Sequence, residues 1–409
     1  MPLVQADSSK SHVRWAPKRD AMARQAVDHD DLTQHGAHVM TVCNACRYCE
    51  QYCPVFPAME EMRTFGKADL ALLANLCHNC GECLYACQYA PPHEFGINVP
   101  NTLARIRLQV YQDYAWPRAL GVAFTRHNLL TAIALAATFS AIFAVAAQNL
   151  SPTNSGDFYA VVPHSVMVTL FGLVFLFSIA AMTVGLLRFL SHTRGLTRGQ
   201  TPVQGSAQGT AQGMAQGTAQ GMAQGTAQGM AQGSAQGSVL IRDILTLRHL
   251  HVSGADCVTA EEHRTPWRRW LHHCTFYGFL LCFASTTVAA IYDNVFGWRA
   301  PYDYTSLPVT LGTIGGAGLL FGSLGLWGLR RRRDRALIDE TQDGLDESFL
   351  ALLFLSTLTG LALLVLRREP MMPWLLIVHL GTVLALFVTL PYSKFVHGLY
   401  RAAALWVAR

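Results

Sequence analysis

Six long apolar segments dominate the chain after residue 126. At about 1.5 Å of rise per residue, a helix of each segment's length crosses the hydrocarbon core of a bilayer. Their interiors contain almost no charged residues, so we predict a six-helix transmembrane domain, with helices 1 and 2 in residues 127–190 and helices 3 to 6 in residues 272–409. The segments cover about residues 127–148, 164–190, 272–296, 306–329, 346–366 and 371–393.

Basic residues flank these segments unevenly and predict their orientation. Arginine or lysine lies before the first segment, between the second and third, after the fourth and after the sixth, whereas residues 149–163 contain neither. Arg367 and Arg368, between the fifth and sixth segments, are exceptions. Residues 1–35 are polar and irregular and are predicted to form an N-terminal tail, without the apolar core of a signal peptide. We therefore expect both termini on the cytoplasmic side.

Polar sequence links the second membrane segment to the third. Within this 191–271 stretch, the tetrapeptide Ala-Gln-Gly-(Thr/Met/Ser) recurs eight times across residues 207–238. Glycine at every fourth position opposes a stable helix, and no apolar face is available for packing. We predict a flexible cytoplasmic tether without chemistry of its own. Ahead of the first membrane segment, residues 101–126 predict an amphipathic connecting segment.

Two runs of four cysteines lie in a region that we assign to residues 36–100. The first three cysteines of each run are separated by two residues, so one turning loop brings three thiolates together. The fourth follows after three residues, and in bacterial two-cluster ferredoxins that thiolate ligates the other cluster. A helix is predicted between the runs, from Glu60 to Leu76. The second run departs from the ferredoxin pattern in one respect, because Gln88 follows it where a proline is usual.

This spacing predicts a ferredoxin-like domain with two [4Fe–4S] clusters. A zinc site would use four ligands, typically as two separated pairs, and would leave thiolates over. Disulfides need an oxidising compartment, and the predicted cytoplasmic location of this region is not one. The predicted fold class is therefore mainly α, with this domain followed by the six-helix transmembrane domain. The predicted ligands are Cys43, Cys46, Cys49 and Cys87 for one cluster, and Cys77, Cys80, Cys83 and Cys53 for the other.

The composition and the missing motifs limit the classes of function that the chain can have. A hydrophobic fraction of 51% and a charged fraction of 14% are typical of a chain that lies largely in membrane lipid. The net charge of +5 comes without a basic patch on a folded domain, so we expect no nucleic-acid binding. No flavin or nicotinamide motif is present, since the glycines within 306–329 miss the G-x-G-x-x-G spacing. The chain is therefore predicted to be an electron-transfer subunit fed by a partner.

Histidines near the membrane segments are candidate haem ligands, because a lipid-buried histidine needs a partner. His379 and His397 would share one helix face, about 27 Å apart, if the helix continued past Pro391. Two b-type haems stacked across the membrane would need this spacing, and we predict one or two b-type haems. The alternative is that a histidine at a helix end lies at the wet interface or bonds a carbonyl. The predicted second ligands are His164 for His379 and, for His397, either His272 or His273, with His127 and His192 as further possibilities.

Several stretches of the sequence resemble the tricarballylate-utilisation protein B family, also called citrate-utilisation protein B. The cysteine-rich stretch includes His78-Asn79-Cys80-Gly81-Glu82-Cys83. The resemblance covers nearly all of the chain outside the N-terminal tail and the repeat, which looks like an insertion. The stretches are Leu76–Phe95, Leu247–Leu250, Arg269–Phe283 and Leu390–Arg401.

The resemblance implies an electron carrier of the bacterial inner membrane. Its partner would be an FAD-dependent tricarballylate dehydrogenase that forms cis-aconitate, and this chain would reoxidise the reduced flavin and pass electrons to the quinone pool. The eight cysteines carry over one by one, whereas the haem histidines are our own inference. Two alternatives stay open: an equivalent redox module for another flavoprotein, in a different tricarboxylate or cobalamin-related pathway, and a six-span transporter or redox sensor. A transporter predicts charges at mid-membrane, which these segments lack.

Overall fold

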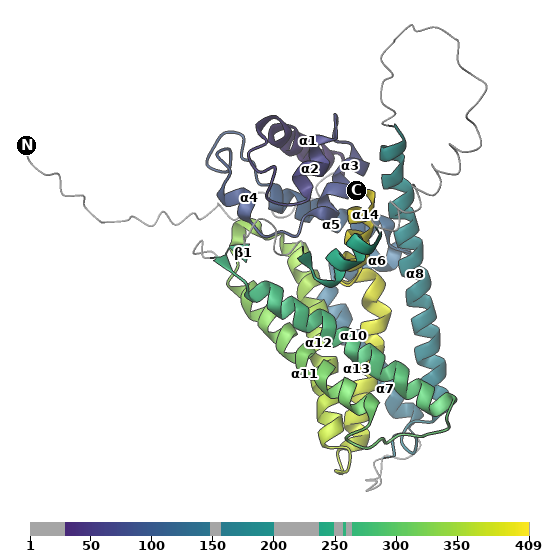
Figure 1. The fold of residues 1–409 in the computed structure, drawn as a ribbon. Helices are drawn as coiled ribbons and strands as arrows, with labels where there is room; N and C mark the ends of the chain where they lie inside the picture. Colours follow the sequence, from purple (N-terminus) through teal and green to yellow (C-terminus); the bar gives the residue numbers. More distant parts are fainter. Residues whose placement is uncertain (1–28, 148–156, 200–236, 249–256, 259–263, 409) are drawn as a thin grey trace, which may run out of the picture.

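The protein is almost entirely helical. The computed structural model describes residues 29–147, 157–199, 237–248, 257–258 and 264–408. Most of the predicted N-terminal tail and of the predicted tether at 207–238 lies outside these described residues. A small helical domain stands on one end of a bundle of long helices (Figure 1). This arrangement confirms the predicted fold class.

Four helices form the core of the small domain: α1 (His29–Cys46), α2 (Val55–Glu60), α3 (Lys67–Leu76) and α4 (Glu82–Tyr85). Met40, Met59 and Leu73 are completely buried between them. Burial of such side chains contributes about 1.5–3 kcal/mol each, which holds the short helices together.

Two boundaries in this domain differ from the prediction. Helix α1 begins at His29, so residues 29–35 are helical rather than irregular. The helix predicted from Glu60 begins only at Lys67. There, the Asp69 carboxylate accepts the backbone N–H of Gly66 at 2.8 Å, which caps a new helix start.

The connecting segment forms two helices, α5 (Val99–Tyr114) and α6 (Arg118–Arg126). Leu103 and Ile106 on α5 are buried against the small domain. The approach to α1 is close, because a Cβ added at Gly36 would lie 2.7 Å from Ile106 Cδ1. Helix α5 therefore joins the small domain to the bundle as a packed element.

Six helices are long and apolar enough to span a membrane, as predicted. Their outer faces expose large apolar side chains, such as Val145 and Leu130. In water such faces would favour aggregation, whereas lipid solvates them. The six are α7 (Asn128–Ala146), α8 (His164–Gly199), α10 (Trp267–Asn294), α11 (Leu307–Arg331), α12 (Glu340–Val365) and α13 (Met372–Thr389).

Helices α10 and α11 pack backbone against backbone. A Cβ at Gly315 would lie 2.8 Å from the Cys282 nitrogen and 2.9 Å from the Gly278 carbonyl oxygen. Such close approach through small residues is typical of membrane helix pairs. It accounts for the glycines that the sequence places in the fourth apolar segment.

The sixth apolar segment does not continue as one helix. A 3-10 turn, η3 (Leu390–Tyr392), ends α13, and the chain resumes as α14 (Val396–Val407). The proline at 391 has no N–H to continue the helical bonds. The continuous helix face predicted for His379 and His397 is therefore wrong, and α14 instead packs against α3 and α8 beside the small domain (Figure 1).

Short elements complete the fold. A helical segment covers residues 237–245. The strands β1 (Cys257–Val258) and β2 (Arg264–Thr265) pair antiparallel, with Cys257 opposite Thr265. A 3-10 turn, η2 (Arg335–Leu337), follows α11.

Candidate redox centres

The two cysteine loops have related backbones. Each contains a residue with positive φ directly after the second cysteine, Arg47 (φ 54°) in the first loop and Gly81 (φ 93°) in the second. A left-handed residue turns the chain sharply between the second and third cysteines of each run. In the second loop, the N–H of Asn79 also points at the Cys77 sulfur, 3.4 Å away.

The eight thiols fall into two groups that exchange their fourth members. Burial raises the pKa of Cys43 to about 12, and Cys87 is the thiol that contributes most to this shift. Burial likewise raises the pKa of Cys53, where the neighbouring thiols are Cys77 and Cys80. The structure thus brings Cys87 to the first run and Cys53 to the second. Ligation by these two sets stays a prediction.

The chemistry of the two thiol sets fits iron–sulfur clusters. The described cysteines form no disulfide. In the described part of the chain, no three His, Cys, Asp or Glu side chains converge closely enough to hold a single metal ion. Each set supplies four thiols, which is the number of thiolate ligands that a [4Fe–4S] cluster takes.

Arginines from outside the cysteine run hold the second loop. Arg107 of α5 donates to the Ala74 carbonyl at 2.7 Å and to the Cys77 carbonyl at 2.6 Å. Arg268 of α10 and Arg333, just past α11, both donate to the carbonyl of Asn79, at 3.1 and 2.6 Å. These bonds fix the loop and surround it with positive charge, which stabilises an anionic cluster.

The segment from Asp334 to Ile338 also binds the small domain. The Tyr85 hydroxyl donates to the Asp334 carboxylate at 2.7 Å. Two asparagine side chains near the start of α5 donate to backbone carbonyls of this segment: Asn98 to Ala336 at 2.8 Å and Asn101 to Ile338 at 2.9 Å. The second cysteine loop is thereby docked on the end of the membrane bundle.

A cavity of about 730 Å³ lies below this loop. Cys77 and Cys80 line one part of its wall, and His272 and His397 line another. Its volume is in the range of sites that bury a ligand of cofactor size. Much of the remaining wall is aromatic, from Phe276, Phe279, Phe349 and Phe395.

His272 and His397 face each other across helices α10 and α14. Their ring centres are 6.0 Å apart and the ring planes cross at 74°. Two imidazoles bound to one iron through bonds of about 2 Å stand with their ring centres about 6 Å apart. This pair therefore fits the two axial positions of a haem.

Hydrogen bonding supports the same fit. His397 Nδ1 donates to the Lys394 carbonyl oxygen, 2.5 Å away, which leaves Nε2 as a possible metal ligand. His272 Nδ1 is buried and has no hydrogen-bond partner among the described residues. Leaving this buried ring nitrogen without a hydrogen bond costs free energy, and a cofactor bound in the cavity would change the surroundings of the His272 ring.

The other candidate histidines have different neighbours. His273 stacks on Tyr277, with ring centres 5.8 Å apart. His164 pairs with Asp293 through Nε2 at 2.8 Å, while His379 lies 3.1 Å from the Thr359 hydroxyl. The structure thus gives His164 and His379 separate partners. His192 bonds the Tyr114 hydroxyl, and His127 precedes α7.

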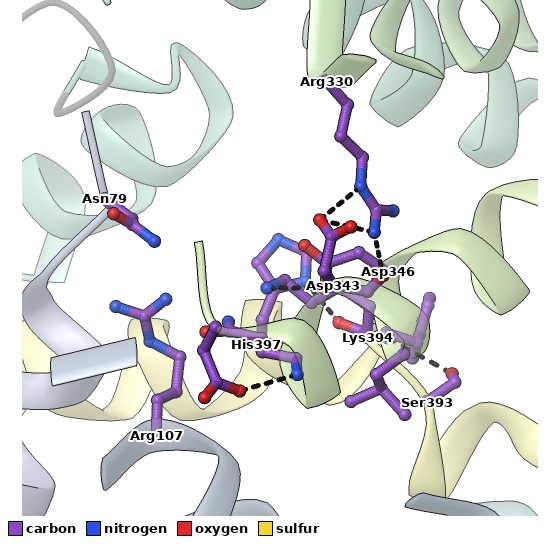
Figure 2. A network of polar contacts seen from close by, with 12 residues as sticks. Asn79, Arg107, Arg330, Asp343, Asp346, Ser393, Lys394 and His397 are labelled. Atoms are coloured by element: carbon purple, nitrogen blue, oxygen red, sulfur yellow. Dashed lines mark hydrogen bonds and ion pairs between the residues drawn. The ribbon is translucent and has the colours of Figure 1, made fainter. Parts of the chain in front are cut away.

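Sequence reasoning missed a charged network on the cavity wall. Arg330, at the end of α11, reaches the Asp343 carboxylate, and Lys394 pairs with Asp346 at 2.9 Å (Figure 2). His397 bonds the backbone carbonyl of Lys394 and so lies next to the Lys394–Asp346 pair (Figure 2). The sequence contained one signal for this network, namely ionisable residues at the ends of the fourth and fifth apolar segments.

Comparison with known proteins identifies the family. Residues 119–409 match the family model for citrate utilization protein B, and residues 36–115 match that for the citrate utilization protein B Fer4-like domain. The chain belongs to the citrate utilization protein B family. A citrate utilization protein B from Escherichia coli is 44% identical over 374 residues, which cover 90% of this chain and 89% of that protein. No solved structure matches the chain.

Membership of the citrate utilization protein B family confirms the resemblance found in the sequence. The Fer4-like match covers all eight cysteines of the two runs and indicates iron–sulfur clusters. The other match includes all six candidate membrane helices. Together they indicate iron–sulfur electron transfer at a membrane.

Proposed function

We propose that this protein reoxidises the reduced flavin of an FAD-dependent tricarballylate dehydrogenase and passes the electrons to the quinone pool of the bacterial inner membrane. Two [4Fe–4S] clusters and a b-type haem would be its cofactors. The name of the Escherichia coli relative supports a role in citrate or tricarboxylate utilisation. The small domain would lie on the cytoplasmic side, with both termini.

The cavity is the observation that supports this function best. It is lined by cysteines of the second loop and by the His272–His397 pair. A haem held there would be adjacent to the second cluster. Electron transfer between separate centres requires such proximity, and the docked loop keeps it fixed.

The residues around the proposed centres bind, orient and exclude water. When bound, the clusters and the haem each accept and release one electron at a time. Cys43, Cys46, Cys49 and Cys87 would hold one cluster, and Cys53, Cys77, Cys80 and Cys83 the other. Arg107, Arg268 and Arg333 fix the second loop through its carbonyls. His397 Nδ1 is held by the Lys394 carbonyl, which orients the opposite ring nitrogen.

An anaerobic redox titration of the purified full-length protein tests the proposal. Non-haem iron and acid-labile sulfide should reach about eight of each per chain, and EPR should show two interacting reduced clusters. Dithionite should produce the optical bands of a b-type haem. Mixing with tricarballylate, its dehydrogenase and a quinone should yield quinol. A chain without iron and sulfide would overturn the proposal.

The identity of the flavoprotein is tested separately. A related flavoprotein, acting on another tricarboxylate or in a cobalamin-related pathway, would require the same centres. Steady-state quinone reduction with each purified flavoprotein and its substrate distinguishes the two. Turnover with the tricarballylate dehydrogenase alone supports the proposed partner, and turnover only with another contradicts it.

A further inference from the structure

Two arginine side chains present buried donors to the cavity without a partner. Arg330 Nη1 and Arg401 Nη2 are both buried, and neither has a hydrogen-bond partner among the described residues. Both residues line the cavity. A buried guanidinium N–H without an acceptor is costly, so these donors indicate a ligand with acceptor groups.

Arg401 lies on the same helix as a proposed haem ligand. It follows His397 by four residues on α14, so the two side chains share one face of that helix, one turn apart. The cavity that Arg401 lines is also lined by Cys77 and Cys80 of the second loop. Arg401 therefore belongs to the cavity that the proposed haem and the second cysteine loop share.

Arg330 is held in a fixed orientation. Its Nε donates to the Asp343 carboxylate at 2.7 Å, and its Nη2 lies 2.6 Å from the same oxygen. Asp343 thus occupies two of the three nitrogens and leaves Nη1 as the remaining donor (Figure 2). A guanidinium held in this way binds a carboxylate with little loss of side-chain entropy.

Lys394, the nearby cation beside His397, is already paired. It contacts Asp346 at 2.9 Å, and its charge is balanced there. The donors left without an acceptor in this part of the cavity are therefore Arg330 Nη1 and Arg401 Nη2. Phenylalanine side chains line another part of the wall, and haem combines a large apolar ring with two carboxylates that can accept these bonds.

We propose that Arg330 and Arg401 each bind one carboxylate of a haem whose iron lies between His272 and His397. This inference rests on the proposed function. It assigns two anchoring residues to the cofactor, in the cavity that Cys77 and Cys80 also line.

A comparison of two haems tests the anchoring directly. Full-length protein from cells that cannot make haem is titrated with protohaem and with its dimethyl ester, which lacks both carboxylates. A charge-assisted bond lost in a buried site corresponds to a tenfold to hundredfold change in affinity. The ester should therefore bind the unchanged protein at least tenfold more weakly than protohaem. Binding is read from the low-spin optical spectrum.

Variants then assign the effect to each arginine. Arg401→Gln and Arg330→Gln should each weaken protohaem binding about tenfold, with a smaller change for the ester. Arg331→Gln is the matched control, because Arg331 is exposed and is not among the residues that line the cavity, so the affinities of this variant for both haems should stay unchanged. Cluster EPR spectra verify that each variant is folded.

The outcomes separate this inference from the proposed function. Equal binding of protohaem and the ester by the unchanged protein would overturn the anchoring while leaving the haem in place. The anchoring would also be overturned if the ratio of the affinities for protohaem and the ester were the same in the unchanged protein and in both variants. If the unchanged protein takes up no haem with a bis-imidazole spectrum, the proposed haem itself fails.

Discussion

The Arg268 guanidinium, in the first turn of α10, donates to the carbonyl oxygen of His78 at 3.0 Å. A positive side chain is unfavourable at a helix N-terminus, where the helix dipole is itself positive. The second cysteine loop explains why an arginine is found there. Arg268 donates to two carbonyls of that loop, those of His78 and Asn79. The first turn of a membrane helix therefore helps to hold a cluster loop.

Replacement of this arginine should change the second cluster selectively. In Arg268→Met the loop loses two charge-assisted bonds and one nearby positive charge. A positive charge favours the reduced cluster, so the midpoint potential of the second cluster should fall by about 40 mV, equivalent to roughly 1 kcal/mol. An EPR-monitored redox titration measures this. Arg269→Met is the control, since Arg269 lies over the Trp270 ring and should leave both potentials unchanged.

The exchange of fourth cysteines between the runs makes a second prediction. Cys87→Ser should give the same EPR spectrum as Cys46→Ser, because both would lose a ligand of the first cluster. Cys53→Ser should instead match Cys80→Ser. Cys282→Ser, which alters a thiol on membrane helix α10, serves as the control. If Cys87→Ser matched Cys80→Ser, each run would hold its own cluster and the exchange would be wrong.

The membrane helices and the cysteine groups were predictable because they depend on local patterns. Apolar length alone located the six spans, and ferredoxin spacing predicted that Cys87 would join the first run and Cys53 the second. The helix break at η3 had a signal in Pro391, although the sequence analysis allowed the helix to continue. Each of these features is encoded within a few turns of chain.

The docking of the two domains was not predictable from such patterns. Asn98 and Asn101 bind carbonyls of Ala336 and Ile338, more than two hundred positions away in the chain. Backbone carbonyls are present at every residue, so the sequence does not mark these partners. The choice between His272 and His273 was open for a related reason, because apolar and small residues follow both faces of that helix.

Close packing of α10 on α11 predicts a sharp difference between two glycines of one helix. At Gly315 an added methyl group would lie 2.8 Å from the backbone of α10, whereas at Gly328 it would meet no atom within 4 Å. Gly315→Ala should therefore destabilise the protein by about 1–3 kcal/mol through overpacking. Gly328→Ala should be neutral or slightly stabilising, because alanine favours the helix. Thermal unfolding in detergent compares them, and equal melting temperatures would contradict the packing.

Two adjacent histidines on α10 predict opposite effects on haem content. His272 faces His397 with ring centres 6.0 Å apart, whereas His273 stacks on Tyr277. His272→Ala should lose most of the haem, since one axial bond is removed from a site that depends on two. His273→Ala should keep it. Haem per chain is measured by the pyridine haemochrome method, with cluster EPR as evidence that each variant is folded.

His379→Ala determines whether a further haem is present at the far end of the bundle. His379 lies beside the Thr359 hydroxyl, and its ring fills the space where a side chain at Gly360 would lie, 2.8 Å from the imidazole Cε1. A ring packed this closely against α12 has little room for a porphyrin. The variant should therefore keep the full haem content of the unchanged protein. A fall to half would instead assign a second haem to His379, with His164 as its candidate partner.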